Sequence, residues 1–215
     1  MRTNRSIKAA VIVAHPDDET IWAGGTLLHH PNWHLIVVSL CRADDPDRAP
    51  KFFRAASEFK AEAHIGKLDD GPAQKPLSQR EVQQTILSLL PDRHFDIVIT
   101  HSPSGEYTRH LRHEETSRAV VALWINKNLF AKEIWMFAYE DGGKRYSPKP
   151  IKTAHRYVHL PKHIWQKKCR IITDLYGFSP DSFEVNAASE NEAFWCFRTL
   201  DEFNNWQLII DRSKK

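Results

Sequence analysis

The sequence has no long apolar run and few cysteines. No stretch approaches the roughly 20 apolar residues that a membrane-spanning helix needs. The segment Met1–Lys8 is polar and basic, and the apolar run behind it is too short for the core of a signal peptide. The three cysteines lie far apart without a CxxC pair, so no disulfide framework is expected: Cys41, Cys169 and Cys196. These absences predict a protein without a membrane span in a reducing compartment, with the cytoplasm as the expected location.

The chain also lacks a strong charge of either sign. Its 30 Lys and Arg residues and 27 Asp and Glu residues leave a formal net charge of +3 at pH 7. A nucleic-acid-binding protein usually carries a clustered basic face, so binding to nucleic acid is not expected. With 41% hydrophobic and 27% charged residues, the 215-residue chain fits a folded domain rather than a disordered segment.

Glycine-rich phosphate-binding motifs are absent as well. The first predicted strand is followed by neither GxGxxG nor GxxxxGK[ST], and the pair Gly24-Gly25 lies too far beyond it. A metal-free nucleotide-binding module therefore remains only as an alternative from another class of function.

Short apolar runs alternate with helix-like segments through the first two-thirds of the chain. Three runs rich in β-branched residues predict strands buried on both faces, over 7–14, 35–41 and 95–100, and a fourth strand is predicted over 134–139. Helical spacing is found over 50–65, 77–90 and 114–126, and Ser78 and Glu81 have the spacing of a capping box. This alternation predicts an α/β fold with a Rossmann-like, mostly parallel sheet and helices on both faces.

The pattern changes after Gly143. A polar segment over 144–152 precedes a predicted strand (154–160), a helix (162–175) and an aromatic helical stretch (189–200). We therefore expect a single domain over 1–215, with a core over 1–143 and a C-terminal elaboration over 144–215. Trp195 and Phe197 are expected in the core or a subunit interface rather than on a sugar-binding surface.

A cluster of metal-ligand residue types follows the first predicted strand, in the segment Ala14-His-Pro-Asp-Asp-Glu19. Open α/β sheets bind ligands beyond the carboxyl ends of their strands. One imidazole and three carboxylates are costly to bury there unless a positive charge compensates them. Because histidine nitrogen and aspartate oxygen both bind zinc, His15 and Asp18 are candidate ligands of one ion.

A catalytic zinc ion has three protein ligands and one open position, so a third ligand is needed. The segment after the strand over 95–100 contains His110 and His113, which are one helical turn apart and lie on the same side of a helix start. From their spacing, either histidine can bind the metal while the other faces a substrate. Either motif alone is uninformative, but the placement of both after buried strands predicts a metal site.

The segment AHPDDE, followed by Gly24-Gly-Thr-Leu27, resembles the signature of the PIG-L/LmbE-like family of zinc-dependent de-N-acetylases. The similarity extends through the helix with Arg54 and through Gly105-Glu-Tyr107 to His110-x-x-His113, over roughly the first two-thirds of the chain. This family includes deacetylases of N-acetylglucosaminyl-phosphatidylinositol, of mycothiol and bacillithiol synthesis, and of diacetylchitobiose.

The resemblance implies one zinc ion per chain, with another divalent metal possible, held by His15, Asp18 and His113. It also implies that Asp17 is the general base and that His110 steadies the oxyanion. On chemical grounds, we expect a protonated His110 to share the developing negative charge with zinc.

Three residues are expected to contact the substrate. The resemblance implies that Arg54 reaches the sugar, and Tyr107 lies in the matching segment. Asp45 follows the second predicted strand at the same sheet edge, although a turn-forming aspartate has the same appearance in the sequence.

Two features depart from the family pattern. Leu111 and Arg112 stand where the family usually has proline and aspartate, and one extra residue separates Tyr107 from His110. The expected function is removal of acetyl from an N-acetylglucosamine-like substrate, an N-acetylated amino sugar or conjugate. The alternatives are an amidase of larger amides or thiol conjugates and a catalytically silent sugar- or nucleotide-binding module. A homo-oligomer is possible.

Overall fold

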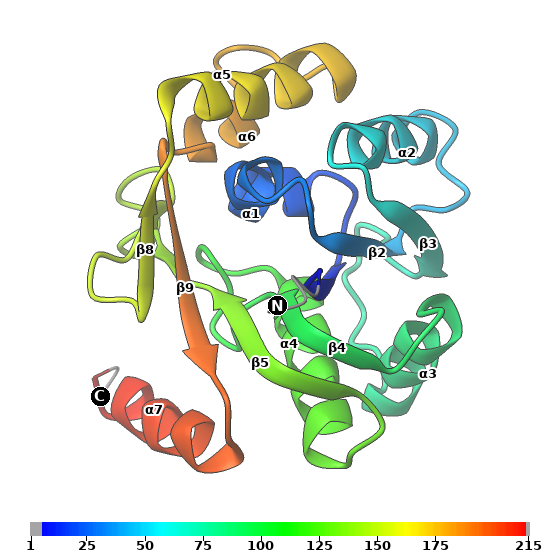
Figure 1. Ribbon diagram of the computed structural model, residues 1–215, viewed down its shortest axis with the longest axis vertical. Helices are drawn as coiled ribbons and strands as arrows, with labels where there is room; N and C mark the ends of the chain where they lie inside the picture. The colour runs from blue at the N-terminus through cyan, green and yellow to red at the C-terminus, as the bar shows by residue number, and fades with distance from the viewer. Residues whose placement is uncertain (1–5, 214–215) are drawn as a thin grey trace, which may run out of the picture.

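A seven-stranded, mostly parallel sheet has the strand order β3-β2-β1-β4-β5-β9-β8 in the computed structural model, which describes residues 6–213 (Figure 1). Five neighbouring strands run parallel: β3 (Glu62–Leu68), β2 (His34–Cys41), β1 (Lys8–Val13), β4 (His94–Thr100) and β5 (Phe130–Phe137). Two antiparallel strands complete one edge, β9 (Asn191–Phe197) and β8 (Arg156–His159). The predicted α/β fold is confirmed.

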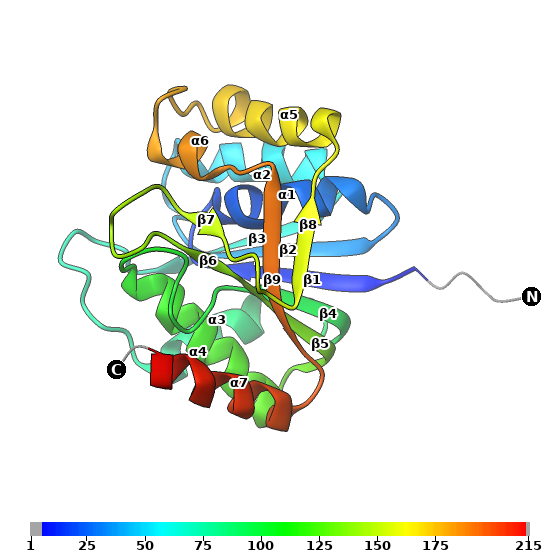
Figure 2. The same ribbon diagram turned by 90° about the vertical axis from the view of Figure 1, so that its left-hand side faces the viewer.

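Helices cover both faces of the sheet (Figure 2). One face carries α1 (Asp18–His29), α2 (Arg48–Glu58), α5 (Lys162–Arg170), the π-helical turn η1 (Ile171–Leu175) and α6 (Phe183–Ala187). The other carries α3 (Gln79–Leu89), α4 (Leu111–Ile125) and α7 (Leu200–Ser213). Successive residues of β1 belong to the two opposite apolar cores. This double burial explains why the strand has no polar alternation.

The predicted helix over 50–65 is wrong in its second half. Helix α2 ends at Glu58, Lys60 has a φ of +56°, and β3 then pairs in parallel with β2. Ala61, Ala63 and Ile65 stand at every second residue, which is the spacing of a strand. In so short a stretch, the same apolar residues also fit the spacing of a helix. The histidine-rich segment consequently follows the fourth strand of the chain rather than the third.

The predicted helical stretch over 189–200 is also wrong. Residues 191–197 form β9, in which Trp195 and Phe197 point into one apolar core and Phe194 points into the other. A strand buried on both faces is apolar at consecutive positions, so its sequence resembles that of a buried helix. Trp195 and Phe197 lie in the core, as predicted.

The remaining predicted elements are present. Ser78 caps α3 by accepting a hydrogen bond from the Glu81 N–H at 3.2 Å, and the predicted helix over 162–175 corresponds to α5 and η1. The polar segment after Gly143 contains β7 (Lys149–Pro150), which pairs with β6 (Tyr139–Glu140). The division of the domain at residue 143 stays a prediction.

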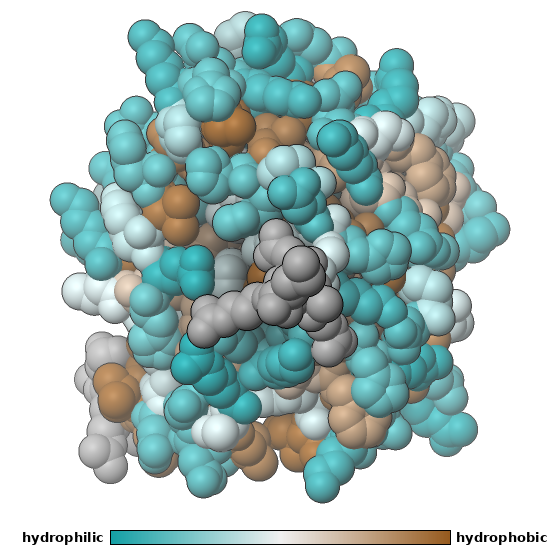
Figure 3. Space-filling view, in the orientation of Figure 1, coloured by the Kyte–Doolittle hydropathy of each residue, from teal (hydrophilic) through white to brown (hydrophobic). Residues whose placement is uncertain are grey.

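The described part of the chain has no helix long and apolar enough to cross a bilayer. Figure 3 shows mostly hydrophilic residues on the face seen in Figure 1, with apolar residues in small groups among them.

The C-terminal part of the chain is anchored on α1 by a buried ion pair. Lys168 donates to Glu192 at 2.7 Å, and the Glu192 carboxylate also accepts the N–H groups of Gly25 and Thr26 at 2.8 and 2.7 Å. Leu160 packs so closely on α1 that a Cβ atom at Gly25 would lie 2.2 Å from it.

We therefore expect Gly25→Ala to lower the free energy of unfolding by about 1–3 kcal/mol, since the added methyl group overpacks this contact. Urea denaturation measures the change. Gly24→Ala is the matched control on the same helix, because its nearest neighbour would be a Thr20 methyl group at 3.3 Å. Equal stabilities of the two variants would contradict the packing argument.

Candidate functional site

The loops that follow β1, β2, β3 and β4 meet at the carboxyl-terminal edge of the parallel sheet. They bring His15, Arg42, Asp70 and His110 to the wall of one cavity of about 230 Å³. This edge is where an open α/β sheet binds its ligands.

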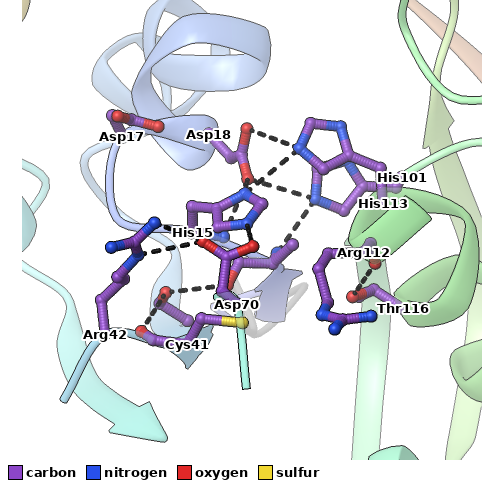
Figure 4. Close-up of polar contacts among 12 residues, drawn as sticks. His15, Asp17, Asp18, Cys41, Arg42, Asp70, His101, Arg112, His113 and Thr116 are labelled. Atoms are coloured by element: carbon purple, nitrogen blue, oxygen red, sulfur yellow. Dashed lines mark hydrogen bonds and ion pairs between the residues drawn. The ribbon is translucent and has the colours of Figure 1, made fainter. Parts of the chain in front are cut away.

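The three predicted metal ligands lie within contact of one another (Figure 4). His15 Nδ1 is 3.1 Å from Asp18 Oδ2, His113 Nε2 is 3.3 Å from Asp18 Oδ1, and the two ring nitrogens are 3.3 Å apart. Ligand atoms about 2.0–2.1 Å from a tetrahedral zinc ion are separated by roughly 3.3 Å. The donor set and its spacing therefore fit a divalent metal.

Asp18 is held as a charged carboxylate at the start of α1. The Trp22 indole N–H donates to its Oδ1 at 3.0 Å, and the backbone N–H of His15 donates to its Oδ2 at 2.9 Å. Burial would raise the pKa of Asp18, but His113 and His101 beside it hold that pKa well below its usual range.

Glu106 sets the tautomer of His113. Its Oε2 lies 2.7 Å from His113 Nδ1 and 3.0 Å from His101 Nδ1, and its Oε1 accepts the Ser102 N–H. Burial would raise the pKa of Glu106, but the two histidines lower it to about 2, so this carboxylate only accepts hydrogen bonds. His113 therefore carries its proton on Nδ1 and presents the Nε2 lone pair to a metal.

His101 forms a group with Asp18 and His113 in which one ligand-type atom of each residue lies within 4.8 Å of the other two. Its Nε2 atom, however, accepts the backbone N–H of Ala14 at 3.0 Å, so this lone pair is already used. His15, rather than His101, is therefore the candidate ligand beside Asp18 and His113. His110 forms another such group with His15 and His113.

Asp17 lies beside the ligands but makes different contacts. The Arg48 guanidinium is 2.6 Å from its Oδ2, and Glu19 accepts its backbone N–H at 3.0 Å. Glu19 is held in turn by the Tyr176 hydroxyl at 2.7 Å. Burial and the Asp18 charge raise the pKa of Asp17 well above its usual range, against the opposing effect of Arg48. Figure 4 shows Asp17 apart from the ligand cluster.

His110 stacks on His113, with ring centroids 4.6 Å apart, and meets the His15 ring edge-on at 4.6 Å. Burial and these two rings lower the pKa of His110 to about 4. The ring is therefore uncharged at neutral pH and donates through a single N–H, which differs from the protonated ring expected from the sequence. Its Nδ1 atom is buried and has no hydrogen-bond partner among the residues of the described range.

Residues 10–124 match the model of one family, described as PIG-L, GlcNAc-PI de-N-acetylase. The chain belongs to the PIG-L family. It is 22% identical over 185 residues to an uncharacterized protein, L374, of Acanthamoeba polyphaga mimivirus, with 78% of this chain and 75% of that protein covered.

Two solved structures with this fold carry different activities. The N,N'-diacetylchitobiose deacetylase of Pyrococcus horikoshii has a TM-score of 0.64 and 18% identity, covering 90% of this chain and 84% of its own. The 4-carboxy-2-hydroxymuconate hydratase GalB of Pseudomonas putida KT2440 has a TM-score of 0.58 and 14% identity, covering 84% and 82%. At these identities the likeness shows the fold alone, so the reaction must be argued from the site.

The cavity of this PIG-L family member is small and has an aromatic wall. It is lined by Tyr107, which contacts Trp22 and Phe183 with ring centroids 6.0 and 5.0 Å apart. At about 230 Å³ it is smaller than the roughly 300–1,000 Å³ pockets that enclose drug-sized ligands. It can bury one small group, with the rest of a larger substrate outside.

Arg54 does not lie at the cavity with the predicted metal ligands, Asp17, Tyr107 and His110. It is exposed on α2, whose buried side carries Phe52, Ala55 and Ala56, and it does not line the cavity. Arg48, at the start of the same helix, lines it instead.

Asp45 does not line the cavity either. Its Oδ1 accepts the N–H groups of Asp47 and Arg48 at 3.0 and 2.9 Å, the contacts of a turn-forming aspartate before a helix.

Besides Arg48, Trp22 and Phe183, the sequence analysis assigned no role to three titratable residues of the site: His101, Glu106 and Asp70. His101 directly follows a predicted strand, and Glu106 lies in the segment shared with the family, so both had a positional signal. Asp70 follows β3, whose first half lies in the helix predicted over 50–65, so the sequence gives no signal for its place at the sheet edge.

Proposed function

We propose that the protein is a zinc-dependent hydrolase that removes an acetyl group from an N-acetylglucosamine-like substrate. The observation that carries the proposal is the convergence of His15 Nδ1, the Asp18 carboxylate and His113 Nε2 within 3.1–3.3 Å, in a chain of a de-N-acetylase family. The deacetylase of P. horikoshii has the same fold, and it is named for an N-acetylated sugar, N,N'-diacetylchitobiose. The cytoplasmic location and a homo-oligomeric state stay predictions.

The three converging residues would hold the metal at the wall of the cavity, which all three of them line. When bound, a divalent cation supplies Lewis acidity toward water and an amide carbonyl. Glu106 fixes the proton of the His113 ring on Nδ1, and Trp22 fixes the orientation of Asp18. These contacts keep the ligands in place before the substrate arrives.

Asp17 is the general base of the proposed reaction. Burial and the neighbouring Asp18 charge raise the pKa of Asp17, which makes its carboxylate a better proton acceptor, and Arg48 keeps the side chain in place. Asp17 takes one proton from the water that attacks the acetyl carbonyl. It returns this proton to the nitrogen as the C–N bond breaks, so the products are acetate and a free amine.

His110 steadies the carbonyl oxygen as negative charge develops there. Its uncharged ring donates one N–H from the cavity wall, and losing such a donor typically costs on the order of 10²–10³-fold in rate. Tyr107, Trp22 and Phe183 supply an apolar wall for the acetyl group that the small cavity can bury.

The proposal is tested by acetate release from a panel of N-acetylated amino sugars, with metal analysis of the same protein. We expect about one zinc ion per chain and turnover that stops on chelation and returns with added metal. Turnover of larger N-acyl or thiol conjugates alone would indicate an amidase instead. Bound zinc without any turnover would indicate a silent binding protein.

We expect Asp17→Asn to keep its zinc and to lower kcat by about 10²–10⁴-fold, because the amide cannot accept the proton. Turnover and metal content are measured on the same sample. His113→Ala is the matched variant, and it should lose the metal itself. Parental turnover in Asp17→Asn would remove Asp17 as the base, and full zinc occupancy in His113→Ala would remove His113 from the ligand set.

Two arginines of α2 form a matched pair. Arg48→Ala should lower kcat/KM by on the order of 10–100-fold, because it removes a charged hydrogen bond to the proposed base. Arg54→Ala, on the exposed side of the helix, should change it by less than about 2-fold. Steady-state kinetics of both variants measure kcat/KM. If Arg54→Ala lowers kcat/KM more than Arg48→Ala does, Arg54 rather than Arg48 is the arginine that matters for the reaction.

A further inference from the structure

Arg112 lies directly before the proposed ligand His113, where the family usually has an aspartate. Its side chain is buried, with 1% of the residue exposed, at the start of α4. Figure 4 shows it pointing away from the metal-ligand cluster. An arginine at this place needs partners, because a buried guanidinium without them is costly.

The partners of Arg112 lie on the segment that connects β3 to α3. Its Nε donates to the Asp69 carbonyl at 2.5 Å and its Nη2 to the Lys75 carbonyl at 2.7 Å. Its Nη1 donates to Glu115, which in turn accepts the Leu77 N–H at 2.9 Å. Arg112 and Glu115 thus fasten both ends of residues 69–77 to the helix that carries His113.

The fastened segment carries Asp70, whose carboxylate faces His15. Asp70 Oδ1 lies 3.2 Å from His15 Nε2, on the side of the ring opposite the Nδ1 atom that faces Asp18 and His113. Arg42 donates to the Asp70 carboxylate through Nε at 3.0 Å, and Gln74 donates to it at 2.9 Å. His15 Nε2 has no hydrogen-bond partner among the described residues, so the charge of the nearby Asp70 carboxylate favours a proton on Nε2 and leaves the Nδ1 lone pair for a metal.

The segment over 69–77 has no helix or strand of its own between β3 and α3. Its backbone carbonyls at Asp69 and Lys75 accept hydrogen bonds from the Arg112 guanidinium rather than from a neighbouring β-strand. Without that arginine, Asp70 would be held by Arg42 and Gln74, and Gln74 belongs to the same segment. Arg42 is itself 45% exposed at its side chain, so it restrains Asp70 less firmly.

We propose that Arg112 and Glu115 are positioning residues for the metal site, which act by holding Asp70 against His15. This inference rests on the proposed metal site. Asp70, on the segment after β3, faces His15. Arg112, at the position where the family usually has an aspartate, holds that segment in place.

The test measures the Zn²⁺ affinity of metal-free protein by competition with a chromophoric chelator, a readout independent of turnover. Asp70→Ala should lower the affinity by about 10–100-fold, the range seen when such a partner of a metal-bound histidine is removed. The neutral pair Arg112→Gln with Glu115→Gln, which leaves no lone buried charge, should lower it by about 10-fold. Circular dichroism and thermal unfolding of the metal-free variants verify that each has folded.

Two control variants calibrate the assay. Arg118→Gln makes the same substitution on the same helix, at a side chain 51% exposed and 3.6 Å from Glu114, and should leave the affinity within about 2-fold of the parent. Glu106→Ala removes the carboxylate beside His113 and should show a loss of the size expected for Asp70→Ala.

A double-mutant cycle separates positioning through Asp70 from any other effect. If Arg112 and Glu115 act through Asp70, replacing them in an Asp70→Ala background should cost less than about 2-fold further. A further 10-fold loss in that background would overturn the inference. If the neutral pair does not fold, Arg112→Lys carries the same cycle, because lysine keeps the charge but not the forked contact to two carbonyls.

The outcomes also separate this inference from the proposed function. Parental Zn²⁺ affinity in a folded Arg112 variant would overturn the positioning role and leave the metal site standing. A parent protein that binds no Zn²⁺ would overturn the metal site and the inference together.

Discussion

The buried contact between the Asp18 carboxylate and the rings of His15 and His113 is the constraint on which the rest of the site depends. These groups are nearly excluded from water, so each needs a partner that fixes its charge and its proton. Trp22 and the His15 backbone fix Asp18, and Glu106 fixes the His113 proton. The ring nitrogens that face one another are thereby kept in place for a cation.

The carboxylates behind the two rings come from different parts of the sheet edge. Glu106 lies on the loop after β4, and Asp70 lies on the segment after β3. The parallel arrangement makes this possible, because the carboxyl ends of four strands meet at one edge. The C-terminal part of the chain also contributes, since Tyr176 holds Glu19 behind Asp17 and Phe183 forms part of the aromatic wall.

The same fold in a deacetylase and in a hydratase shows why the chemistry has to be argued from side chains. Both reactions bring water to a carbon centre, and the strands supply only a common edge on which the loops are placed. We base the proposed amide hydrolysis on the match to a de-N-acetylase family, together with a raised pKa at Asp17, an uncharged donor at His110 and a small cavity beside the proposed ligands.

The sequence alone determined the parallel core and indicated the candidate site residues, because buried strands have continuous apolar runs and pairs such as His110 and His113 have short, fixed spacing. It did not determine β3 or β9, since a short edge strand and a strand buried on both faces have patterns that helices share. Tertiary structure decided that Asp70 rather than a neighbour meets His15 and that Arg48 rather than Arg54 meets Asp17. Such contacts join residues far apart in the chain, and only the packing of the sheet and its helices brings their atoms within hydrogen-bond distance.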